Sequence, residues 1–161
     1  AEELAFEQGG RDGAGVQVDQ RPASGGAGGV TGAGERRAAT ADFTYADVTD
    51  DTYMAAVDLP GGAIVVGGHL AITTLFNSAT DDKFSIGDKV GAASATKDTY
   101  AALSADITAV GAVPIVATGK KYSEPSTVGV VWNGTGTAPS AGVGRLTVLY
   151  IVDGRAAFTQ G

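Results

Sequence analysis

The chain has 161 residues with 18 acidic and 11 basic side chains, which gives a formal net charge of -7. This balance argues against a nucleic-acid-binding protein, because phosphate binding requires a basic surface. With no cysteine and one histidine, disulfides, thiolate metal sites and two-histidine zinc sites are excluded. No apolar run approaches the ~18 residues of a membrane span. We therefore expect no nucleic acid or membrane partner, no metal and no cofactor.

The N-terminal part differs in composition from the rest. Glycine accounts for 25 residues of the chain, and 10 of these lie in residues 1–38. Ordering such a segment alone would cost roughly 1–2 kcal/mol per residue in backbone entropy, with little apolar surface to offset it. We predict an extended Gly-rich N-terminal arm over residues 1–38, flexible alone and ordered on a partner, followed by one domain over residues 39–161. The alternative is a flexible leader without a function.

Apolar and basic side chains of the arm are candidates for contact with that partner. The apolar-acidic start, AEELAFEQ, can form one helical turn on another surface, and the arginines can pair with acidic groups there. The candidate contact residues are Leu4, Phe6, Arg11, Arg21, Arg36 and Arg37.

After the arm, short runs rich in β-branched and aromatic residues recur between Gly, Pro, Asn, Asp and Ser clusters, which predicts strands. The third strand should be broken or bulged near Gly67–Gly68, and only Asp98–Ala105 resembles a helix. The expected strands are Ala41–Val48, Thr52–Asp58, Ala63–Phe76, Lys83–Gly87, Ile107–Val110, Ile115–Tyr122, Thr127–Trp132 and Arg145–Val152.

This number of strands fits an all-β fold, an antiparallel β-sandwich with a jelly roll as the leading form and an immunoglobulin-like sandwich second. The last strand is apolar on both faces. Leu146, Val148 and Tyr150 share one face, while Leu149 and Ile151 lie on the other. We expect that strand to be central in its sheet or to face a subunit interface.

The search for catalytic chemistry yields little. His69 lies in an alternating strand, which favours a position on a strand face or in an interface over a catalytic base, and no G-x-S-x-G motif is present. Asp50-Asp51 and Asp81-Asp82, with Asp88 near the second pair, could be calcium ligands, but the EF-hand pattern is missing, so we expect these residues in solvated loops. The sequence therefore predicts no enzymatic activity.

Trp132 is the only tryptophan of the chain and directly precedes the Asn133-Gly134 turn. At a loop edge it could stack against a sugar, together with the loop at Asn77–Asp82. A tryptophan in this position more often seals the end of a sandwich core, and we expect that role here.

Four segments between Leu59 and Arg155 resemble small structural proteins of tailed bacteriophages. They are LPGGAIV from Leu59, FSIGD from Phe84, GKKYSEP from Gly119, and TAPSAGVGRLTVLYIVDGR from Thr137. The resemblance covers about residues 55–155 and consists of strand and turn patterns, not catalytic residues. It implies a head decoration (cement) protein with a β-sandwich body on the outer surface of the capsid, where the partner is the major capsid protein.

From these observations we expect a non-enzymatic decoration protein that stabilises the mature phage head. Jelly-roll decoration proteins commonly form trimers, so self-association as a trimer is favoured over a dimer. The absence of cysteine suits synthesis in the reducing cytoplasm of the host bacterium before release in the virion. The alternative is a phage fibre or adhesion module that binds host-surface glycan through Trp132 and its neighbouring loops.

Overall fold

The computed structural model of the chain describes residues 36–153. These residues form eight strands and contain no helix that could cross a membrane. In chain order the strands are β2 (Arg37–Thr44), β3 (Thr52–Leu59), β4 (Ala63–Thr74), β5 (Asp81–Val90), β6 (Thr96–Ala101), β7 (Gly111–Pro114), β8 (Ser126–Thr135) and β9 (Val143–Val152).

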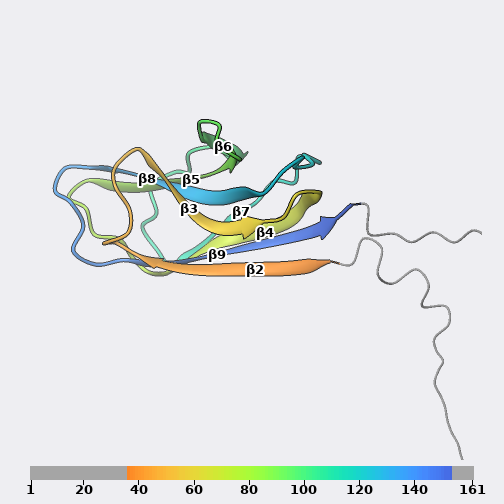
Figure 1. The fold of residues 1–161 in the computed structure, drawn as a ribbon. Helices are drawn as coiled ribbons and strands as arrows, with labels where there is room; N and C mark the ends of the chain where they lie inside the picture. Colours follow the sequence, from red (N-terminus) through yellow and green to blue (C-terminus); the bar gives the residue numbers. More distant parts are fainter. Residues whose placement is uncertain (1–35, 154–161) are drawn as a thin grey trace, which may run out of the picture. The chain divides into compact units, whose positions relative to one another are not determined.

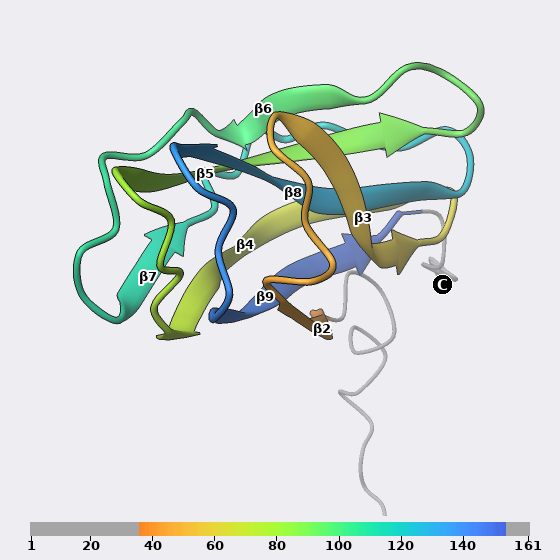
Figure 2. The ribbon, with the colours of Figure 1, turned by 90° about the vertical axis from the view of Figure 1, so that its left-hand side faces the viewer.

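The strands form two four-stranded antiparallel sheets, with the order β2-β9-β4-β7 in the first and β3-β8-β5-β6 in the second. The two sheets lie face to face, as Figures 1 and 2 show from two directions. The chain crosses between the sheets at most connections, and this strand order is that of a jelly roll. The predicted antiparallel sandwich of jelly-roll type is therefore confirmed, while residues 1–35 of the predicted arm lie outside the described residues.

Three phenylalanines pack at the centre of one end of the core. The rings of Phe76 and Phe84 meet edge to face with centroids 5.0 Å apart, and Phe43 lies 6.2 Å from Phe76. Two glycines make room for these rings. A Cβ on Gly144 would come within 2.4 Å of Phe43, and one on Gly142 within 2.5 Å of Phe76. The sequence Gly-Val-Gly at the start of β9 is thus required by the packing of the core.

The predicted irregularity in the third strand is a β-bulge in β4. Val65 is opposite Tyr150 and Gly67 is opposite Leu149 on β9, so Val66 is the extra residue. A bulge changes which residues face inward. Ala63 and Val65 point into the core before it, and Leu70 and Ile72 do so after it. The bulge keeps both halves of a 12-residue strand in contact with one core.

The helix predicted at Asp98–Ala105 is absent, because β6 occupies the first part of this range. Tyr100 is 1% exposed and points into the core, and Ala101 lies opposite Ile86 on β5. Pairing with β5 and burial of one aromatic ring outweigh the weak helical preference of a short segment.

The strands predicted at Ile107–Val110 and Ile115–Tyr122 are also wrong in position. The strand of this region is β7, which lies between them and includes Gly111 and Pro114. Glycine and proline usually interrupt a central strand, because proline cannot donate a hydrogen bond to a neighbouring strand. β7, however, lies at the edge of the first sheet and pairs only with β4, and proline is tolerated there. Of the second range, Lys121 alone makes an isolated bridge, to Ile64.

The bulge provides a test with two adjacent glycines. Gly68 has a φ of 133°, and a Cβ there would lie 2.1 Å from the carbonyl oxygen of Thr147. A Cβ on Gly67 would meet only a methyl group of Leu149, at 3.9 Å. Gly68→Ala should lower the free energy of unfolding by about 2 kcal/mol or more, whereas Gly67→Ala should change it by less than about 1 kcal/mol. Denaturant unfolding of both variants measures the difference, and equal values would contradict the bulge geometry.

Candidate functional site

Two of the predicted contact residues lie at the start of the first sheet. Arg36 is exposed directly before β2, and Arg37 is the exposed first residue of β2, opposite Tyr150 of β9. The two arginines therefore border the edge of this sheet. The other four candidates lie outside the described residues: Leu4, Phe6, Arg11 and Arg21.

His69 lies on the outward side of β4, where its neighbours across the sheet are Thr147 of β9 and Pro114 of β7. It is exposed, and none of these neighbours can orient or accept its protons as a catalytic carboxylate would. The position is that of a strand-face histidine, as the alternating sequence predicted.

The acidic residues proposed as possible calcium ligands have separate partners. Asp50 accepts a hydrogen bond from the amide of Gly134 at 3.1 Å, Asp51 pairs with Lys97 at 2.9 Å, and Asp81 pairs with Lys83. Within residues 36–153, no three histidine or acidic side chains come together as metal ligands.

Asp82 and Asp88 do not lie in solvated loops, as the sequence analysis expected, but face inward from β5 with exposures of 5% and 1%. The carboxylate of Asp82 accepts hydrogen bonds from the indole nitrogen of Trp132 at 2.8 Å and from the amide of Ser78 at 3.1 Å. The Asp82 amide donates to Asp106 at 2.8 Å. Burial of this carboxylate is possible because each oxygen has a donor.

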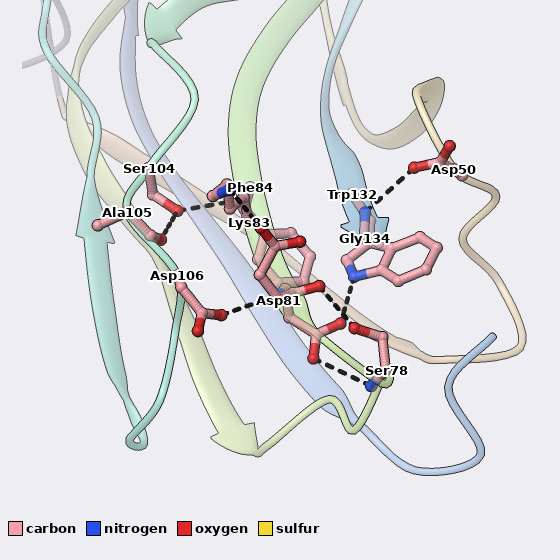
Figure 3. Close-up of polar contacts among 11 residues, drawn as sticks. Asp50, Ser78, Asp81, Lys83, Phe84, Ser104, Ala105, Asp106, Trp132 and Gly134 are labelled. Carbon is pink, nitrogen blue, oxygen red and sulfur yellow. Dashed lines mark hydrogen bonds and ion pairs between the residues drawn. The ribbon is translucent and has the colours of Figure 1, made fainter. Parts of the chain in front are cut away.

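Trp132 closes one end of the core. Its side chain is 5% exposed, and Figure 3 shows its indole nitrogen directed at the carboxylate beside it. The backbone of Gly134 covers the ring, since a Cβ there would lie 2.0 Å from it. The ring therefore seals the core, and its covered face is not free to stack on a sugar.

A pocket of about 300 Å³ nevertheless lies beside this ring, between the β2–β3 and β8–β9 connections. Tyr45, 40% exposed, stands in its wall, and Asp50 contributes a carboxylate. The Asn77 side chain fixes the β8–β9 connection, because its oxygen accepts the amides of Ser140 and Ala141 at 2.8 and 3.0 Å. The pocket thus combines an exposed aromatic ring with polar atoms on anchored loops.

A second polar cluster surrounds Asp88 at the other end of β5. Its carboxylate accepts hydrogen bonds from Lys120 at 2.5 Å, Thr99 at 2.5 Å and Tyr122 at 2.7 Å, and the Tyr122 hydroxyl lies 2.5 Å from that of Tyr100. Burial alone would raise the pKa of Asp88, but the three donors outweigh it and hold that pKa below its usual value. Burial also raises the pKa of Tyr122, which stays protonated. The cluster stabilises the fold: Asp88, Tyr100 and Tyr122 are buried in it, and Lys120 reaches it from the surface.

The outward side of the first sheet, which we call the outer face of the first sheet, carries apolar side chains on all four strands. Polar and charged side chains lie among them, at Thr40, Asp42, His69, Arg145 and Thr147. The members of this face alternate with core residues, so they point away from the core. Val110 directly precedes β7 and Val116 lies two residues after it, and each is 63% exposed. The apolar residues on the strands of this face are Ala38, Ile64, Ala112, Pro114, Leu149 and Ile151.

Ion pairs lie at the two ends of this face, and the exposed Arg36 and Arg37 border it as well. Asp42 and Arg145 form a two-point ion pair at 2.6 and 2.9 Å at one end, and Lys121 pairs with Asp153 at 2.6 Å near the other. The outward side of the second sheet also carries charges, at Asp58, Lys83 and Lys89, which alternate with core residues. The less charged part of the outer face of the first sheet, around Ile64, Leu149 and Ile151, is a candidate for an interaction surface.

Neither a protein-family model nor a curated protein sequence matches the chain. Solved structures do match, and all are similar in fold. A chain of the cyanophage Pam1 capsid asymmetric unit aligns with a TM-score of 0.57 and 22% identity, over 83% of this chain and 94% of that chain.

Two further phage structures match to a similar extent. For the acidic stable capsid of Helicobacter pylori bacteriophage KHP30, the TM-score is 0.54 and the identity 19%, over 73% of this chain and 87% of that one. For the capsid of Ralstonia phage GP4, the values are 0.53 and 20%, over 76% and 86%. The chain therefore shares its sandwich fold with chains in three phage capsid structures.

The Asp88 cluster predicts a pH-dependent contribution to stability. Because the pKa of Asp88 is lowered in the folded state, its carboxylate stabilises the fold above the unfolded pKa of about 4 and loses this effect as pH falls through the lower, folded value. Asp88→Asn should lower the free energy of unfolding by about 2 kcal/mol at pH 7, and the deficit should shrink below pH ~4. Urea unfolding across this pH range tests it.

Asp42→Asn is the matched control for this prediction, because Asp42 also pairs with a cation but is exposed. An exposed pair contributes little, so this variant should unfold close to wild type at every pH. A deficit of Asp88→Asn that stays constant from pH 7 to acid would contradict a role of the charged carboxylate.

Proposed function

We propose that this protein is a non-enzymatic decoration (cement) protein that binds the outer surface of a phage head and stabilises the mature shell. The observation that carries the proposal is the shared fold with chains of three phage capsid structures. The sequence resemblance of residues 55–155 to small phage structural proteins points in the same direction.

The size of the matching chains supports a small capsid component. In all three cases the aligned part is a larger share of the neighbour chain than of this chain. Each neighbour chain is therefore shorter than 161 residues and holds little more than one sandwich. A chain of this size supplies contact surface to a shell, as a decoration protein does.

The chemistry of the described residues is consistent with a binding role. The two buried aspartates of β5 hold Trp132 and Tyr122 in the core, and His69 has no carboxylate beside it. The partner in this proposal is the major capsid protein, contacted by the arm of residues 1–38 and by Arg36 and Arg37. The protein also associates with itself, as a trimer or a dimer, and is made in the host cytoplasm before it joins the virion.

Decoration can be tested by sedimenting purified full-length protein with undecorated mature heads and with unexpanded procapsids. Saturable binding to mature heads, at a fixed copy number per capsid subunit, is the expected result, because a cement protein stabilises only the state that it binds. The copy number distinguishes trimer from dimer sites. Absence of binding to both particles would overturn the proposal.

The arm is tested in the same experiment. Because β2 begins at Arg37, deletion of residues 1–35 leaves the first sheet complete. Loss of a tethered second contact should weaken binding to mature heads at least ~100-fold, with the thermal unfolding of the sandwich as a control for folding. Heads decorated as tightly by the shortened protein would show that the arm is not a contact.

A second candidate, a fibre or adhesion module that binds host-surface glycan, is favoured by one observation, the pocket beside Trp132. Its exposed aromatic wall, Tyr45, and the carboxylate of Asp50 are groups that bind sugars by stacking and hydrogen bonding. The sealed position of Trp132 removes the stacking surface that the sequence suggested, so Tyr45 would take that role.

The single tryptophan reports on this pocket directly. A saccharide in the pocket should change the fluorescence of Trp132, and Tyr45→Ala should weaken the effect about 10-fold or more. Soluble host polysaccharide is the probe, and Val116→Ala, which removes an exposed side chain outside this pocket, is the control. An unchanged spectrum at millimolar saccharide would remove this candidate.

A further inference from the structure

β2 is an edge strand with one side open for pairing. It pairs with β9 on its other side, and no second strand lies beside it in the described part of the chain. The amide of Tyr45, directly after β2, donates to the carbonyl oxygen of Gly142 on the β9 side. Successive residues of a strand direct their backbone groups to opposite sides. The N–H and C=O groups of Ala38, Thr40 and Asp42 therefore point to the open edge.

The other three edge strands are protected against the addition of a further strand. β3 has a bulge at Ala56, the pairing of β6 with β5 is irregular, and β7 has only four residues and ends at Pro114. Bulges, proline and short length are features that block sheet edges. β2 has none of them, because its eight residues pair with β9 without a register shift. Of the edges in the described sandwich, that of β2 is the one suited to strand addition.

A pocket of about 330 Å³ lies directly beside this edge, between β2 and β3. The two strands border the same side of the sandwich, as Figure 2 shows. Ala41 and Phe43 of β2 and Met54 and Ala56 of β3 form an apolar wall, and Asp47 contributes a carboxylate. A side chain of a strand added to β2 can enter this pocket, because inward side chains of a new strand lie next to those of its neighbour.

Asp47 provides a free acceptor for that side chain. Its Oδ2 accepts hydrogen bonds from the amide and the hydroxyl of Thr44 at 2.8 and 2.9 Å. These bonds lower the pKa of Asp47, so its carboxylate is charged at neutral pH. Its Oδ1 has no donor within residues 36–153. A long basic side chain matches the pocket, because its stem can contact the apolar wall while its end reaches this oxygen.

We propose that the edge of β2 binds an extended segment of the major capsid protein, which adds a strand to the first sheet and places a lysine or arginine in the pocket between β2 and β3. This contact rests on the proposed function and deepens it by naming the surface of the protein and the chemistry of the partner segment. In strand addition, backbone hydrogen bonds give affinity, and pockets for alternate side chains give specificity.

The charges along the edge select the partner segment further. The exposed Arg36 and Arg37 border the beginning of β2, whereas Asp42 and Asp47 lie at its end. The added strand should therefore carry an acidic residue at one end and the basic residue at the other.

Two other occupants fit this edge less well. In the segment that precedes β2, glycine occupies six of the ten residues 25–34, and glycine weakens a strand because it has no side chain to pack. The same ten residues include neither lysine nor arginine for the pocket. A second copy of the chain carries a net charge of -7, so two copies repel one another at long range.

Thr40→Pro tests the edge, because proline has no N–H and the Thr40 amide points away from β9. The variant keeps the hydrogen bonds to β9, so its thermal unfolding should be close to that of Thr40→Val, the matched control that retains the amide. In sedimentation with mature heads, Thr40→Pro should bind at least about 10-fold more weakly than the wild type. Thr40→Val should bind like the wild type.

Hydrogen exchange measured at single amides locates the added strand. In the free full-length protein, the amides of Ala38, Thr40 and Asp42 should exchange fast, because they point to the open edge. Those of Ala39 and Ala41 should exchange slowly, because they face β9. On mature heads the first three amides should become protected as well.

Four outcomes would overturn the inference while leaving decoration intact. They are equal binding of Thr40→Pro and wild type, edge amides that stay unprotected on heads, protection in the free protein that disappears on deletion of residues 1–35, and protection in the free protein that increases with its concentration. The third would assign the edge to the preceding segment and the fourth to a second copy. A wild type that does not bind heads would overturn both this inference and the proposed function.

Asp47→Asn is a second variant for the case that Thr40→Pro does not fold. The asparagine retains an oxygen for the Thr44 amide but loses the charge that a basic side chain would meet. It should weaken binding to heads about 5-fold or more, and the loss should shrink at high salt. Wild-type affinity of this variant would show that no basic side chain lies in the pocket and would overturn the inference.

Discussion

The inward face of β5 is the constraint on which the rest of the sandwich depends. It reads Asp82, Phe84, Ile86 and Asp88, with a carboxylate at each end and apolar side chains between them. A shift of one residue in the pairing with β8 would turn Lys83 and Lys89 into the core and Phe84 outward. The two carboxylates therefore fix the register as firmly as the apolar residues do, provided that each finds its donors.

The donors to these two carboxylates come from segments far away in the chain. Through them β5 binds an aromatic residue at each end of the sandwich. Asp82 binds the indole of Trp132 on β8, and Asp88 binds the hydroxyl of Tyr122. The backbone of Tyr122 is in turn hydrogen-bonded to Gly62 and Ala63 at the start of β4. The Asp88 cluster thus links the second sheet to the first, and each aromatic residue is held by its polar atom as well as by its ring.

Sequence patterns were sufficient for the fold because the jelly roll is built from local alternation. Leu70 and Ile72, two residues apart, share the inward face, and the bulge lies where Gly67–Gly68 interrupt the pattern, as predicted. The sequence pattern gave wrong predictions where hydrogen-bonded pairing with another strand determines the local structure. β6 lies where the pattern predicts a helix. β7 is not predicted because it contains glycine and proline, which interrupt a central strand but are tolerated in an edge strand.

The same limit applies to the candidate site. The alternation of Asp82, Phe84, Ile86 and Asp88 was a signal that both carboxylates face inward, but their donors at Trp132 and Tyr122 become neighbours only in the folded chain. The sequence showed that the outward side of β9 carries apolar residues. Their neighbours Ala38 and Ile64 depend on the order of the strands in the sheet, which no single strand encodes.

The buried carboxylates of β5 and the exposed start of β2 have separate roles in the sandwich. Asp82 and Asp88 face the core, where aromatic side chains far away in the chain bind them. Arg36 and Arg37 are exposed where the first sheet begins. In the proposed function these arginines and the residues before them contact one acidic surface. Each contact then holds the next nearby at a high effective concentration, so several weak contacts act as one strong contact.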